Sequence, residues 1–188
     1  MFKNDRYYNK YLTALKSAPF FKDSSEESIH QLLSFCKHEQ WKVKTFKNST
    51  EVLSTFYFIV SGRLKIYKSN PETGREHTVF VLSGGDVFDV LSLLDSKSHD
   101  VYWKALDNLE VLKMSMDQMR NWISQYPETH SAIFRYLGER MQRLMDVATD
   151  VALHSTLVRL SSLLLKNING ETLKLELINN LSNKEIAR

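Results

Sequence analysis

The sequence predicts an α+β protein in which helices flank an antiparallel β jelly roll, and a long helix and the start of a small second domain follow it. Three observations support this fold class. Apolar residues recur at helical spacing over 7–36 and again over 127–167, and short apolar runs separated by turn residues fill residues 40–116. Several short strands at close intervals favour a sandwich or jelly roll over a parallel sheet.

Two helices are expected before the strands. Tyr8, Tyr11 and Leu15 lie at helical spacing until Pro19 breaks the pattern, and residues 24–27 open a second helix. The apolar positions of that second helix are Ile29, Leu32, Leu33 and Phe35. We interpret both helices as packing on the core.

The middle of the chain is expected to be a series of antiparallel strands. The apolar runs include residues 40–46, 56–60, 63–68, 77–82, 101–105 and 109–114. Leu64 and Ile66 alternate with polar neighbours, as in a half-buried strand. Ser61-Gly62 is interpreted as a tight turn, and residues 69–74, with their proline and glycine, as a hairpin loop.

A long helix is expected after Pro127, because apolar residues recur there in a heptad-like seam. The seam consists of Ile133, Leu137, Met141, Leu144, Val147, Ala148 and Val151. Such a seam either packs on its own domain or pairs with a second copy of itself. Ser155 is expected to cap a further helix, which ends near Gly170.

The end of the chain predicts a short strand at 173–177 and then the opening of another helix. Ser182 is a suitable N-cap, and Glu185 three residues later completes a capping box. A capped helix of this kind is typical of the first helix of a helix-turn-helix unit, whose turn and second helix do not follow here. The sequence is therefore interpreted as a fragment. A helix that simply frays at the C-terminus is the alternative.

Composition excludes several classes of protein. Hydrophobic residues make up 43% of the chain and charged residues 25%, and the net charge of +3 is too weak to indicate nucleic-acid binding by itself. The single Cys36 excludes an internal disulfide and a cysteine-only metal or iron–sulfur site. Neither a signal peptide nor a run long enough to span a membrane is present, which favours a cytoplasmic protein. Since no catalytic motif appears, we expect neither an enzyme nor a metal site.

The order of elements and several short motifs resemble the Crp/Fnr family of bacterial transcription regulators. The motifs are Thr55–Ser61 with Gly62, Gly74-Arg75-Glu76, Leu82–Phe88, Leu109–Ser115, Arg159-Leu160 and Leu181–Ala187. The resemblance implies a cyclic-nucleotide-binding-like sensor domain over 1–125, a dimerisation helix over 126–153 and part of a winged helix-turn-helix domain over 154–188. It also implies a homodimer that, in the full-length protein, binds duplex DNA in successive major grooves and contacts RNA polymerase. The start of the DNA-binding domain would contain Arg159, Ser182, Lys184, Glu185 and Arg188.

The sequence departs from the family pattern at the ligand pocket. Where cyclic-nucleotide-binding relatives have Gly-Glu-Leu, this chain has Asp89, Val90 and Leu91, and where they have an arginine followed by serine or threonine it has His99 and Asp100. On the long helix, Leu144 and Met145 replace polar residues. A cyclic phosphate would face carboxylates without a guanidinium, so cyclic AMP is disfavoured and no cofactor is expected.

Other effectors and another function class stay open. Haem ligation by His77 or His99 and a redox role for Cys36 are alternatives, although a histidine or buried cysteine is more often structural. A stand-alone ligand-binding or scaffold domain that never binds DNA is the alternative function. The sequence past residue 188 would distinguish the two.

Overall fold

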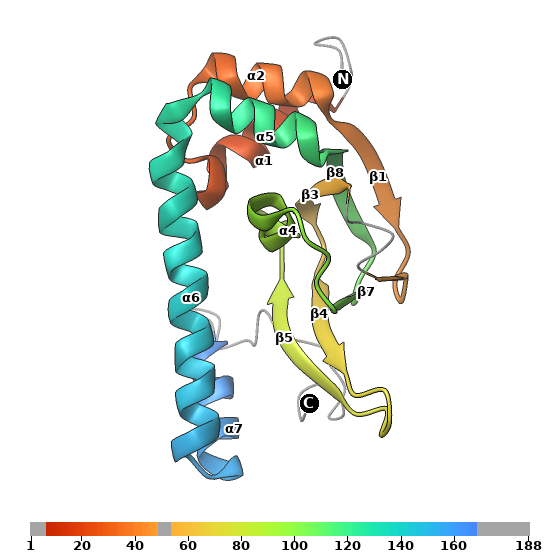
Figure 1. The fold of residues 1–188 in the computed structure, drawn as a ribbon, viewed down its shortest axis with the longest axis vertical. Helices are drawn as coiled ribbons and strands as arrows, with labels where there is room; N and C mark the ends of the chain where they lie inside the picture. Colours follow the sequence, from red (N-terminus) through yellow and green to blue (C-terminus); the bar gives the residue numbers. More distant parts are fainter. Residues whose placement is uncertain (1–6, 49–53, 169–188) are drawn as a thin grey trace. The chain divides into compact units, whose positions relative to one another are not determined.

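The computed structural model describes residues 7–48 and 54–168 (Figure 1). The chain divides into two compact units, Met1–Arg135 and Tyr136–Arg188, which are described separately. The expected strand at 173–177 and the capped helix from Ser182 lie outside the described residues.

The first unit opens with helices, as the sequence predicts. They are α1 (Tyr8–Ser17), a 3-10 turn (Pro19–Phe21) and α2 (Glu26–Phe35). Ser25 caps α2 by accepting a hydrogen bond from the amide of Ser28 at 3.2 Å. The core-facing interpretation is confirmed for Tyr11, Leu15 and Ile29, which are buried, whereas Phe35 at the end of α2 is exposed.

Two four-stranded antiparallel sheets form a β-sandwich, in the orders β1-β8-β3-β6 and β2-β7-β4-β5. The strands are β1 (Lys37–Trp41), β2 (Phe46–Asn48), β3 (Thr55–Ser61), β4 (Leu64–Ser69), β5 (Glu76–Leu82), β6 (Val87–Phe88), β7 (Tyr102–Ala105) and β8 (Leu109–Ser115). The jelly-roll prediction is therefore confirmed at the level of a sandwich of antiparallel sheets.

The expected single strand at 40–46 is wrong, because a turn divides it between the two sheets. β1 ends at Trp41 and pairs with β8, whereas β2 begins at Phe46 and pairs with β7. Lys44 adopts a left-handed conformation with φ of 68°, and its amide donates to the carbonyl of Ala105 at 2.8 Å. The chain thus changes sheets within four residues.

Two further helices of the first unit were not expected. α4 (Val90–Asp95) follows β6, and α5 (Met116–Gln125) follows β8. Ser115 and Gln118 form a capping box at the start of α5. The indole of Trp122 donates to the carbonyl of Ser28 at 2.8 Å, so α5 packs beside α2 at one end of the sandwich (Figure 1).

The long helix and the helix after it lead into the second unit. After a 3-10 turn (Pro127–Thr129), α6 runs from His130 to Leu153, and α7 runs from Thr156 to Lys166. Ser155 occupies the expected N-cap position of α7, but its side chain makes no capping hydrogen bond. None of the described helices is both long and apolar enough to cross a bilayer.

Candidate functional site

The turn that leads into α4 is held tightly against β3. The amide of Ile59 donates to the carbonyl of Asp86, and the amide of Gly85 donates to the carbonyl of Ile59, both at 2.9 Å. A side chain at Gly84 would meet the carbonyl oxygen of Val60 at 2.9 Å, so this position requires glycine. These contacts fix the point from which α4 starts.

Two left-handed residues bound α4. Asp89 at its start has φ of 65°, and Ser96 after its end has φ of 58°. Asp89 stands where the family resemblance expects glycine, and aspartate tolerates this conformation better than most residues. The amide of Leu93 donates to the Asp89 carbonyl at 3.1 Å. Asp89 thus adopts the left-handed backbone conformation that glycine favours, and it adds a carboxylate at this position.

That carboxylate is in an unfavourable environment for a negative charge. Burial raises the pKa of the Asp89 carboxyl, although hydrogen bonds from Ser92 act in the opposite direction. Its Oδ2 atom is buried and has no hydrogen-bond partner in the described part of the chain. Because even this one charge is poorly solvated, a bound anion beside it would be disfavoured.

His99 is already engaged with α4 rather than facing an empty site. Its Nε2 lies 3.1 Å from Oδ2 of Asp95, the last residue of the helix. Asp95 also accepts from the amide of Lys97 at 2.9 Å, and this bond is the main reason that the pKa of Asp95 is lowered. The imidazole is therefore paired with a carboxylate of its own loop.

The other predicted pocket residues are placed differently. Val90 is half-buried, whereas Leu91 and Asp100 are exposed. Leu144 and Met145 lie on the part of α6 that belongs to the second unit, and both are exposed there. The structure thus gathers Asp89 and His99 around α4, while Leu91 and Asp100 face solvent.

Aromatic side chains fill the space between the two sheets. The core there is formed by Trp41, Tyr57, Ile59, Leu64, Leu82, Phe88, Trp103, Ala105, Leu109 and Val111. Trp103 is 1% exposed, and its Nε1 has no hydrogen-bond partner within the described residues. The sandwich interior at this level is a packed core with one unsatisfied donor.

The sequence interpretation missed Arg120, a residue of α5 that binds α4. Its Nη2 donates to the carbonyl of Ser92 at 2.7 Å and its Nε donates to the carbonyl of Leu93 at 3.0 Å. Its Nη1 donates to Asp117 at 3.1 Å. No spacing rule could indicate this contact, because the partners are 27 and 28 residues away and are backbone atoms.

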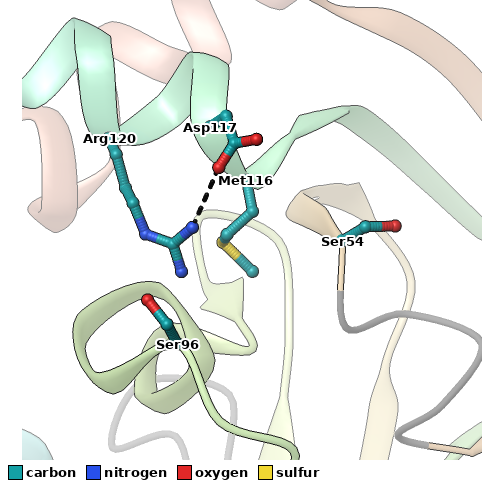
Figure 2. A pocket seen from close by; sticks show the side chains of 5 residues that line it. All are labelled: Ser54, Ser96, Met116, Asp117 and Arg120. Atoms are coloured by element: carbon teal, nitrogen blue, oxygen red, sulfur yellow. Dashed lines mark hydrogen bonds and ion pairs between the residues drawn. The ribbon is translucent and has the colours of Figure 1, made fainter.

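A small cavity lies beside this arginine. It has a volume of about 230 Å³ and is lined by Ser54, Ser96, Met116, Asp117 and Arg120. Figure 2 shows Arg120 reaching from α5 toward Ser96 at the end of α4, with Asp117 on the same helix. The cavity is thus located at the junction of α4 and α5.

The predicted seam on α6 is largely exposed. Met141, Leu144, Val147 and Val151 are between 42% and 64% exposed, and Ala148 is exposed as well. Leu137 is half-buried, whereas Ile133, which lies in the first unit, is only 5% exposed. Ile133 is therefore already covered, and the exposed apolar stripe begins after it.

The remaining candidates provide no site within the described residues. Among the residues of the predicted DNA-binding start, Arg159 donates to Thr156 at 3.2 Å, and Ser182, Lys184, Glu185 and Arg188 lie outside the described ranges. Burial raises the pKa of Cys36 to about 12, so its thiol is poorly suited to redox chemistry. His77 is exposed, and residues 7–48 and 54–168 contain no cluster of side chains that could hold a metal ion.

Comparison with known proteins shows what this sandwich is similar to. Residues 46–126 match the family model described as the cyclic nucleotide-binding domain. A CRP-like cAMP-activated global transcriptional regulator of Mycobacterium tuberculosis is 28% identical over 95 residues, which cover 50% of this chain and 42% of that protein. A global nitrogen regulator of Nostoc sp. is 31% identical over 87 residues, which cover 45% of this chain and 39% of that protein.

A solved structure shows the same fold. The sensor domain of the transcriptional regulator DNR from Pseudomonas aeruginosa superposes with a TM-score of 0.63 at 19% identity, over 76% of this chain and 95% of that chain. The matched segments span less than half the length of the two curated relatives.

Proposed function

We propose that this chain, whose residues 46–126 form a cyclic-nucleotide-binding domain like those of Crp/Fnr-family regulators, is the sensor portion of a cytoplasmic transcription regulator. The observation that carries the proposal is the combination of this domain with α6, a 24-residue helix whose apolar stripe is exposed. A sensor domain followed by a helix with an exposed apolar stripe is suited to pass a conformational change to a partner subunit.

The proposed dimer forms through α6. Contiguous exposed apolar surface often marks an interaction site, and two-fold symmetry is the usual way for two copies of a chain to cover it. The stripe consists of Leu137, Met141, Leu144, Val147, Ala148 and Val151. Pairing of these residues would orient whatever follows α7 in each subunit.

The proposed sensor does not respond to cyclic AMP. Asp89 adds a poorly solvated carboxylate where the phosphate would approach, and His99 is paired with Asp95. The effector is then either a less anionic molecule or absent, in which case regulation would depend on the amount of protein. The packed aromatic interior of the sandwich is compatible with a less anionic effector and with the absence of an effector.

DNA binding is proposed for the full-length protein rather than for residues 1–188. The domain proposed for 154–188 would supply only the start of a helix-turn-helix unit, and a net charge of +3 provides little nonspecific attraction to DNA. RNA polymerase is a further proposed partner. The alternative is a scaffold or ligand-binding domain without DNA binding.

Selection from fragmented genomic DNA tests this proposal. The gene product extended past residue 188 and the 188-residue chain are each incubated with the fragments, and bound DNA is sequenced. We expect the extended product to enrich sites with two-fold symmetric half-sites and the 188-residue chain to enrich none. Failure of the extended product to enrich any sequence would favour the scaffold alternative. Specific binding by residues 1–188 alone would contradict the proposal that DNA binding needs residues past 188.

A further inference from the structure

We propose that Arg120 is a positioning residue that holds the sensor-loop helix α4 in place through the backbone carbonyls of Ser92 and Leu93, so that the loop is ordered without an effector. The inference deepens the proposed function, because it rests on α4 as the sensing element. It concerns only the first unit.

α4 cannot be stable by itself. It contains six residues, and isolated helices of that length do not form in water. The last carbonyls of any helix also lack partners inside the helix. Ser92 and Leu93 belong to this last turn, and Leu91 and Leu94 on the other face are exposed. The helix therefore depends on contacts from outside.

The guanidinium of Arg120 adds hydrogen bonds at this helix end, where the Ser92 carbonyl also accepts from the amide of Ser96 at 3.1 Å. Two of its nitrogens donate to the carbonyls of Ser92 and Leu93, at 2.7 and 3.0 Å. Bonds from a charged donor are stronger than those between neutral groups, and a cation is favourable at the C-terminal end of a helix. The planar guanidinium presents its donors to the two carbonyls in a fixed arrangement, which the compact ammonium of lysine does not provide.

The ion pair with Asp117 is secondary. The Asp117 side chain is 88% exposed, and exposed pairs contribute little because water and salt screen them. Asp117 lies one turn before Arg120 on α5 and orients the guanidinium toward α4 (Figure 2). The two carbonyl bonds should thus account for most of the effect.

α5, which carries Arg120, is itself held in place by contacts that do not involve α4. Its capping box, the buried Met119 and the bond from Trp122 to Ser28 hold it independently of α4. Its far end is connected to the start of α6, where Nε2 of His130 donates to the carbonyl of Ile123 at 3.2 Å. Arg120 thus connects α4 to α5, the helix whose end contacts the start of α6.

Hydrogen exchange of the 188-residue chain tests the inference. The variants are Arg120→Gln, Arg120→Lys and Asp117→Asn. The matched control is Arg135→Gln, which removes another arginine ion pair of the first unit, to Asp23, without touching α4.

We expect Arg120→Gln to raise exchange of the α4 amides by about tenfold or more, because it removes two charge-assisted bonds. The amides of α5 and β3 should be unchanged. Arg120→Lys should restore part of the protection, and Asp117→Asn and Arg135→Gln should leave α4 as it is. Unchanged exchange of α4 in Arg120→Gln would overturn the inference, and so would an equal rise in α4, α5 and β3, since that is a general loss of stability.

The measurement needs neither DNA nor an effector. If α4 loosens as expected while the extended product selects no DNA, Arg120 still positions the helix and the proposed regulator function fails. If DNA is selected but α4 does not respond to Arg120→Gln, the regulator function stands and the role of Arg120 is wrong.

Discussion

Tyr57 and Phe88 stack face to face between the two sheets, with ring centroids 4.7 Å apart and ring planes 4° from parallel. They are also register partners on β3 and β6. Trp41 packs edge-on against both rings, at 5.5 and 5.9 Å. Since β6 leads directly into α4, this aromatic cluster anchors the sensor loop from inside the sandwich.

Removal of the Phe88 ring should strongly destabilise the first unit. Phe88 is 1% exposed, and replacement of a buried phenylalanine by alanine costs about 3–5 kcal/mol. Urea denaturation of Phe88→Ala should show this loss in the free energy of unfolding. Phe46→Ala is the matched control, because Phe46 is half exposed and stacks on Tyr102 outside this cluster, and its loss should be below about 1.5 kcal/mol. Equal losses would show that the cluster around Phe88 is not a core.

Cyclic AMP and cyclic GMP should bind weakly or not at all. A phosphate entering the loop would meet the Asp89 carboxyl and a His99 that is already paired with Asp95. Calorimetric titration of the 188-residue chain is the direct measurement. Dissociation constants in the low micromolar range that are lost on substitution within 89–100 would show that this reading of the loop is wrong.

Substitution of Asp89 by asparagine should stabilise the protein near neutral pH. Burial raises the pKa of Asp89 in the folded state, so the folded protein holds this proton more tightly than the unfolded chain does. Stability from this group is therefore present below the unfolded pKa and is lost as the pH rises through the raised folded pKa. Asparagine tolerates the left-handed conformation at this position and carries no charge.

The pH dependence provides the check on that prediction. Urea denaturation of both proteins should show Asp89→Asn to be more stable above the raised pKa, with the difference shrinking as the pH falls toward the unfolded value. A variant that is less stable at neutral pH would mean that the ionised carboxylate is favourably bound, and the argument against an anionic effector would lose its main support.

Local patterns predicted most elements of the fold, and long-range contacts explain part of what they missed. The strands around Leu64 and Leu112 were recognised because alternation and apolar runs are properties of a few neighbouring residues. The break at Lys44 was missed because it depends on a hydrogen bond to Ala105, 61 residues away in sequence. α5 was missed although Ser115 and Gln118 form a capping box and Met116, Met119 and Trp122 recur at helical spacing, so this local signal was present in the sequence.

The candidate site was predicted only in part, for a similar reason. Asp89 and His99 were identified by their positions in the family motif, which is a local property of the loop. Nothing in the sequence indicated that His99 pairs with Asp95 or that Arg120 binds the carbonyls of α4. Every residue has a backbone carbonyl, so the residue types do not show which carbonyls accept a side-chain hydrogen bond. Only the folded structure shows this.

The exposed stripe on α6 leads to the last prediction, which concerns assembly. Light scattering of the 188-residue chain should give about twice the mass of 21.9 kDa, and Leu144→Asp should weaken association by at least about tenfold, because it places a charge in an apolar seam. Gln142→Asp is the control, since Gln142 lies on the opposite face of α6 and is bonded to Asp146. A strict monomer at high concentration, or equal weakening by both substitutions, would count against dimerisation through this helix, because only Leu144 lies within the stripe.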